Sequence, residues 1–237
     1  MLRRTLLAVV LLGAVTLAGC TAAPVAAPLA APVAAPIAVP APTGDKTLSI
    51  GTLFPMTGVN AASGAAQVAG AEVALRDILA GQAAPAQPVQ LIHRNSAGDL
   101  AAAYADLVAR GVDLVLWDAT TALPTDAEGS VDNAAIVALS DFANGGTPLA
   151  ADEAFTARLT TADPGIAATA GGAEAYDGVV TAALAAAITG DDGGASIEAG
   201  WPQVTAGSAV CTSWGECVLA LAERENIDYQ GITGRRS

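Results

Sequence analysis

Residues 48–79 read LSIGTLFPMTGVNAASGAAQVAGAEVALRDIL, and this stretch decides the fold. Apolar residues alternate at its start, which is typical of a half-buried strand. A Pro-x-Thr-Gly break at 55–58 follows, and apolar residues then recur every three or four positions, which is the period of a helix. The stretch therefore predicts a strand, a polar loop and a helix, with Glu72 and Arg76 forming an i,i+4 ion pair on another face of that helix.

The loop between this strand and helix is rich in hydroxyl groups and contains glycine. Its free backbone N–H groups lie at the positive end of the helix dipole, where an anion such as a carboxylate is favoured. Thr57 and Ser63 are the candidate ligand-contacting residues of this loop. The alternative role of both hydroxyls is to cap the start of the helix.

Strand and helix patterns alternate further along the chain. They predict a second strand, a helix that Asp99 caps, and a third strand, at residues 89–93, 99–110 and 112–117. This order implies a parallel sheet with right-handed crossovers, in which ligands bind at the carboxyl ends of the strands. The candidate binding loops are therefore 55–64, 94–99 and 118–125.

Residues 134–139 form another strand-like run that ends next to Ser140. Two interpretations stay open for it: a fourth strand of the same lobe with Ser140 facing the ligand, or a junction to a later region. Helical patterns follow at 152–159 and 173–188.

Three blocks of this sequence resemble one known family, the solute-binding lipoproteins of ABC importers in the Leu/Ile/Val-binding group. The first block closely resembles the start of the mature proteins and rests on Ile50, Gly51, Pro55, Thr57, Gly58, Gly64, Gly70, Ala71 and Ala74. The second block, AYDGVV at 175–180, and the third, CTSWGEC at 211–217 with IDYQGITG at 227–234, are similar to later parts of the same family. All three occur in the family's order.

This resemblance implies an α/β, type I periplasmic-binding-protein-like lobe in three layers with a mostly parallel sheet. It implies binding of a branched-chain or other small amino acid, or a similar polar solute, and an ABC permease as partner. Thr120 and Thr121 keep the hydroxyls expected after the third strand, whereas Trp117 and Asp118 replace small residues. The ligand-binding residues that we expect are Thr57, Ser63, Thr120, Thr121 and Ser140.

The chain is short for this family. Fewer than about sixty residues separate Asp118 from Tyr176, where the family builds most of a second lobe, and a βαβ lobe of ordinary size needs more. We therefore expect the second lobe to be missing or reduced, which would leave a ligand half exposed. The alternative function is that of a degenerate single-lobe paralogue that acts as a non-transport envelope adaptor.

The beginning of the chain has the layout of a targeting segment. Residues 1–19 predict a signal peptide, with two arginines before an apolar run. The Leu-Ala-Gly-Cys ending resembles a bacterial lipobox, so Cys20 is expected to carry lipid; the alternative is an ordinary secretory cleavage. Residues 20–45 are mostly Ala, Pro and Val and predict a tether. The protein would thus be extracytoplasmic and anchored to the cell membrane, with residues 46–237 as its single lobe.

Two further cysteines remain once Cys20 is assigned to a lipid. Cys211 and Cys217 then form an even pair in an oxidising compartment, so we expect a disulfide that pins a local turn. A metal site is the rival interpretation, but two thiols and the distant His93 do not make a convincing zinc site.

Composition argues against several other functions. The 237 residues carry a net charge of −13 with only ten Lys and Arg, which argues against a nucleic-acid partner. The sequence has no phosphate-binding loop and no Gly-x-Ser-x-Gly motif, and its single histidine excludes paired-histidine metal motifs. We therefore expect no enzyme activity, no cofactor and no metal. The acidic pair Asp191 and Asp192 is interpreted as a helix-ending turn rather than a calcium loop.

Overall fold

The computed structural model describes residues 41–81, 87–120, 123, 134–143, 149 and 151–235. All described residues belong to one compact unit. The expected signal peptide and Cys20 lie outside the described residues. None of the described helices combines the length and the apolar character that crossing a membrane requires.

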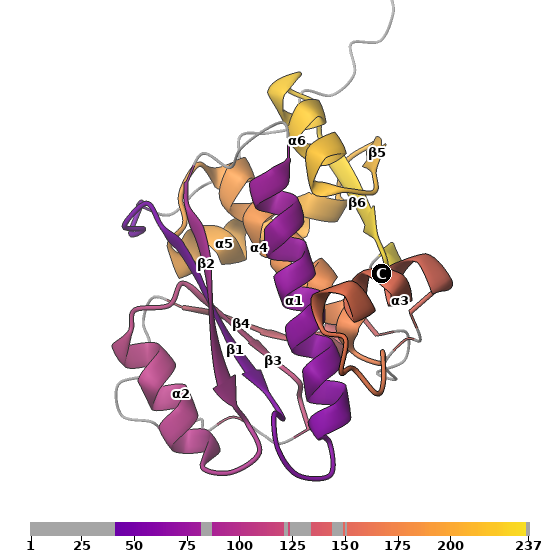
Figure 1. The fold of residues 1–237 in the computed structure, drawn as a ribbon. Helices are drawn as coiled ribbons and strands as arrows, with labels where there is room; N and C mark the ends of the chain where they lie inside the picture. Colours follow the sequence, from indigo (N-terminus) through magenta and orange to yellow (C-terminus); the bar gives the residue numbers. More distant parts are fainter. Residues whose placement is uncertain are drawn as a thin grey trace, which may run out of the picture. The chain divides into compact units, whose positions relative to one another are not determined.

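A four-stranded parallel sheet forms the centre of this unit (Figure 1). Its order is β2-β1-β3-β4, with bounds Val89–Asn95 for β2, Leu48–Phe54 for β1, Leu114–Trp117 for β3 and Ala135–Ala138 for β4. The prediction of a mostly parallel sheet is confirmed. The run at 134–139 is a fourth strand of this same sheet, since Leu114 of β3 pairs with Ala135.

Helices cover both faces of the sheet. Helix α2 (Leu100–Ala109) packs on one face, where Leu107 meets Leu53 and Val115 in a small apolar cluster. Helices α1 (Ala61–Ala80) and α4 (Gly172–Thr189) cover the other face and belong to the larger core. Neighbouring residues of a strand point to opposite faces, and so β1, β2 and β3 each supply residues to both clusters.

Local sequence explains how several helices begin. The Asp99 side chain accepts a hydrogen bond from the Ala102 amide at 2.9 Å and caps α2 as predicted. Asp152 caps α3 (Glu153–Ala162) in the same way, through the Phe155 amide at 2.7 Å. The described parts of residues 119–171 hold β4, a 3₁₀ turn η1 (Leu139–Asp141) and α3.

The predicted ion pair between Glu72 and Arg76 is not formed. Glu72 instead accepts from His93 of the neighbouring strand, with 3.1 Å between Oε1 and Nε2. The strand brings an imidazole to α1, and this tertiary contact replaces the local i,i+4 pair that helix geometry alone allows.

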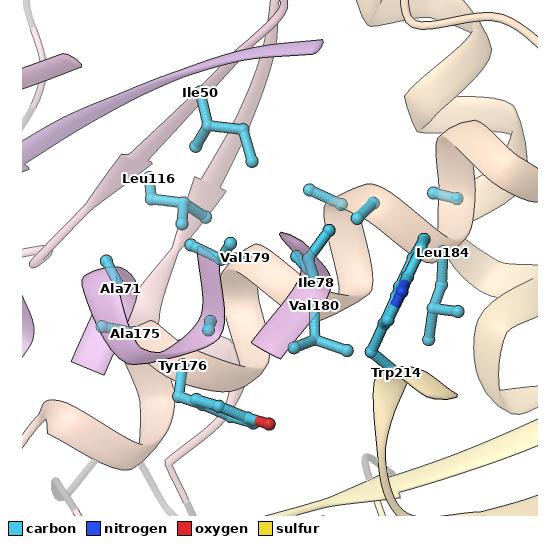
Figure 2. Close-up of a cluster of buried hydrophobic side chains, with 14 of the residues drawn as sticks. Ile50, Ala71, Ile78, Leu116, Ala175, Tyr176, Val179, Val180, Leu184 and Trp214 are labelled. Atoms are coloured by element: carbon cyan, nitrogen blue, oxygen red, sulfur yellow. The ribbon is translucent and has the colours of Figure 1, made fainter. Parts of the chain in front are cut away.

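Close contact between α1 and α4 builds the larger core. A Cβ atom added to Gly70 would lie 2.0 Å from the carbonyl oxygen of Gly172, so only glycine allows the two backbones to approach this closely. Figure 2 shows Ala71 of α1 and Ala175 of α4 below Ile50 and Leu116 of the sheet. Small side chains on both helices therefore let the sheet and the two helices share one apolar cluster.

The chain after α4 forms a second, smaller sheet. Its elements are α5 (Gly194–Gly200), a 3₁₀ helix η3 (Trp201–Thr205), β5 (Ala209–Cys211), α6 (Trp214–Ala222), β6 (Ile227–Gly231) and β7 (Gly234–Arg235). Strand β6 pairs in parallel with β5 and antiparallel with β7. A disulfide joins Cys211 at the end of β5 to Cys217 of α6, which confirms the predicted local bridge.

Asp177 ties α4 to the end of this smaller sheet. Its carboxylate accepts hydrogen bonds from the Tyr229 hydroxyl at 2.7 Å and the Ile232 amide at 3.0 Å. The amide and hydroxyl of Thr233 donate to its other oxygen, each at 2.7 Å. Burial raises the pKa of Asp177, and these donors oppose that shift. The second and third sequence blocks therefore meet at one buried carboxylate, which we call the Asp177 clamp.

Candidate solute-binding edge

The carboxyl ends of the four parallel strands lie along one edge of the sheet, which we call the strand-end edge. The strands end there at Phe54, Asn95, Trp117 and Ala138. Thr57, Thr120 and Ser140 each follow one of these ends within a few residues. Thr121 lies outside the described residues.

Thr57 is exposed and is held by Asn95 at the end of β2. The Asn95 amide nitrogen donates to the Thr57 hydroxyl at 2.8 Å, and its carbonyl oxygen accepts from the Met56 amide at 2.9 Å. Asn95 was not among the predicted site residues, although an asparagine at the end of a strand is a common turn-forming residue. It joins the loops after β1 and β2 into one surface.

Ser63 lies in the first turn of α1 and donates to the Ala170 carbonyl oxygen at 3.3 Å, in the loop before α4. The N-cap residue of α1 is Asn60, whose side chain makes no capping bond. Neither Thr57 nor Ser63 is therefore the cap. Within the described part of the chain, the backbone amides of Ala62 and Ser63 donate to no acceptor.

Thr120 forms a turn with Asp118. The Thr120 hydroxyl donates to the Asp118 carboxylate at 2.8 Å, and its amide donates to the other oxygen at 3.4 Å. Trp117 packs against the apolar cluster on the α2 face, so its ring is not part of the turn that Asp118 and Thr120 form. Ser140 is half-buried in η1, and its carbonyl oxygen accepts from the Ala143 amide at 3.2 Å.

The structure thus brings together only part of the predicted site. Thr57 contacts Asn95, whereas Ser63 is directed to the loop before α4 and Thr120 to its own turn. These are the internal bonds that hydroxyl side chains commonly make in turns. The features left for a ligand at this edge are the two amides of α1 and the carboxylate of Asp118.

A line of three side chains crosses from the sheet to α1. The Thr52 hydroxyl lies 2.7 Å from Nδ1 of His93, whose Nε2 contacts Glu72. Thr52 is fully buried, so its hydroxyl has no access to a substrate and this line holds elements together. No three His, Cys, Asp or Glu side chains within the described ranges are placed to hold a metal ion.

Comparisons with protein-family models, with curated proteins and with solved structures gave no match. Function is therefore inferred from the contacts, burial and charges of the described residues, together with the sequence.

Carboxylates gather at the opposite end of the strands. Asp113 precedes β3, and its side chain accepts from the Ser49 amide at 2.8 Å. Burial raises the pKa of Asp113 to about 7, and the negative charges of Asp192, Asp45 and Asp191 add to this shift, while the Ser49 amide opposes it. The fold therefore disfavours the charged form of Asp113.

This raised pKa makes stability depend on pH. In the unfolded chain the pKa of Asp113 is 3.8, so folded Asp113 keeps its proton at pH values where the unfolded chain has lost it. The stability that this protonation provides is lost as pH rises through about 7. We expect the melting temperature to fall between about pH 5 and about pH 8, and to fall less in Asp113→Asn, whose amide oxygen still accepts from Ser49. Thermal denaturation of both proteins checks this; an identical fall in both would contradict it.

Proposed function

We propose that this chain is an extracytoplasmic solute-binding lipoprotein related to those of ABC importers, and that it binds a small amino acid or similar polar solute. The observation that carries the proposal is the strand-end edge, where the loops after β1 and β2 contact each other and α1 begins with two free amides. Open parallel sheets bind ligands at this edge.

The chemistry of the edge suits a zwitterion. The amides of Ala62 and Ser63 lie at the positive end of a 20-residue helix and would receive a carboxylate. Asp118 would receive an ammonium group, and Thr120 orients its carboxylate. An amino acid carries both a carboxylate and an ammonium group, and this edge has a complementary group for each.

The resemblance of three sequence blocks to the solute-binding family supports the same proposal. The first sequence block supplies β1, the loop and α1, and the second and third blocks meet at the Asp177 clamp. The sheet order β2-β1-β3-β4 with helices on both faces is compatible with one lobe of such a protein. An ABC permease would be the partner that receives the solute.

Calorimetric titration of the detergent-solubilised full chain with a panel of small amino acids tests this proposal. We expect saturable binding of at least one of them, weakened about fivefold by Thr120→Ala through the lost orientation of Asp118. Thr160→Ala is the matched control, because Thr160 is an exposed threonine of α3 that bonds only within its own helix. The absence of binding across the panel, or equal effects of the two substitutions, would contradict the proposal.

A second candidate function is an envelope adaptor that contacts another protein. Two exposed apolar residues favour it. Val59 is fully exposed in the loop after β1, and Ile136 is half exposed on β4, the last strand in the described order of the sheet. Apolar side chains at a sheet border are typical of interaction surfaces. The same titration separates the two candidates, because an adaptor requires no solute.

Membrane attachment through Cys20 is a further part of the proposal, and fractionation of cells tests it. We expect the full chain in the membrane fraction and Cys20→Ser outside it, because that substitution removes the thiol that would carry the lipid. Cys211→Ser serves as control, since it removes a cysteine and the local disulfide but not the anchor. Retention of Cys20→Ser in the membrane fraction would disprove lipid anchoring.

A further inference from the structure

A cavity of about 440 Å³ lies along α1 and adjoins the strand-end edge at Met56 and Ala61. Its walls are α1, the end of β2 and the end of α3, which lies beside α1 (Figure 1). This volume falls within the range of small-molecule sites in proteins, about 300 to 1,000 Å³. Sequence analysis did not indicate it, because its walls come from segments about ninety residues apart.

Small apolar side chains form the floor of the cavity. Ala61, Ala65 and Val68 recur on one face of α1 at helical spacing and leave room above the helix. Met56 and Ala162 close two sides. An apolar group of a ligand would remove this surface from water, which favours binding.

Charged groups border the same floor, and two of them are the carboxylates of Glu72 and Asp163. Glu72 gives one oxygen to His93, and Asp163 gives one to the Gly165 amide at 2.9 Å. The second oxygen of each has no hydrogen-bond partner among the described residues. Each carboxylate is held in place by the hydrogen bond to one of its oxygens. Its second oxygen is therefore available to a ligand.

Arg76 is the one Lys or Arg among the described residues that line this cavity. It is exposed, makes no ion pair with any described residue, and also lines a neighbouring hollow of about 300 Å³ between α1 and α3. Its guanidinium group therefore lies at the border of the cavity, between the two hollows.

We propose that this cavity binds a small organic amine with an apolar body. The ammonium group lies between the free oxygens of Glu72 and Asp163, and the apolar body covers Ala65 and Val68. A carboxylate of the same shape is rejected, because it would meet two fixed carboxylates. The cavity adjoins the strand-end edge, but the groups proposed to hold the amine are Glu72 and Asp163 rather than Asp118 and the free amides of α1, so amine binding does not depend on the proposed solute.

His93 makes the test direct, because it is the single histidine of the chain and contacts Glu72 at the cavity. In a protein without a histidine tag, its imidazole gives a single Cε1–H signal. Cyclohexylammonium chloride is titrated into the full chain, with cyclohexanecarboxylate as the probe of equal shape and opposite charge. We expect a saturable shift of the imidazole signal with the amine, at millimolar or lower concentration, and none with the carboxylate.

Substitutions then locate the binding. Asp163→Asn keeps the acceptor for Gly165 but removes the charge, and we expect it to weaken amine binding about threefold. Ala65→Phe fills the floor and abolishes binding, whereas Ala157→Phe, its matched control in the neighbouring hollow, leaves the affinity unchanged. An imidazole shift of equal size with the carboxylate, no saturable shift with the amine, or binding retained in Ala65→Phe would each overturn the proposal. Amino-acid binding at the strand-end edge is measured separately through Thr120→Ala, so either proposal can be disproved alone.

Discussion

The close approach of α1 and α4 is the constraint on which the rest of the structure depends. Gly70 and Gly172 touch backbone to backbone, although about a hundred residues separate them in the chain. This contact joins the first βα unit to the segment that carries the smaller sheet. Together the two helices bury one face of the four-stranded sheet, and without both of them this face would be left in water.

Both proposed sites depend on how this contact places α1. Its first turn lies at the strand-end edge, where two amides are free, and its outer face forms the floor of the cavity beside α3. The Asp177 clamp and the Cys211–Cys217 disulfide hold the chain that follows α4. One helix pair thus positions an anion-attracting helix start and, on another face, a cavity bordered by carboxylates.

Much of the architecture is predictable from local pattern. Alternating apolar residues from Leu48 to Phe54, the Asp99 cap and the helical period of 173–188 each give an element that the structure confirms. These features are set by residues close in sequence, which is why local reasoning finds them. The disulfide follows in the same way from two cysteines six positions apart.

Contacts between distant segments account for the errors and omissions. Glu72 was expected to pair with Arg76 but contacts His93, 21 residues away, and Ser63 contacts Ala170, 107 residues away. Asn95 gains its position only when β2 reaches the loop after β1, and Asp163 only when α3 reaches α1. Local pattern shows that a residue is polar and where its element lies, whereas its partner depends on the tertiary fold.

Hydrogen exchange of the folded chain tests the central role of the α1–α4 contact most directly. If the two helices form one cooperative unit, the slowest amides of residues 61–80 and 172–189 have the same opening free energy, and Gly70→Ala lowers both together. Gly215→Ala is the control, because a Cβ atom at that position of α6 meets no atom within 4 Å. Protection that falls in α4 alone, or stays unchanged in Gly70→Ala, would contradict this dependence.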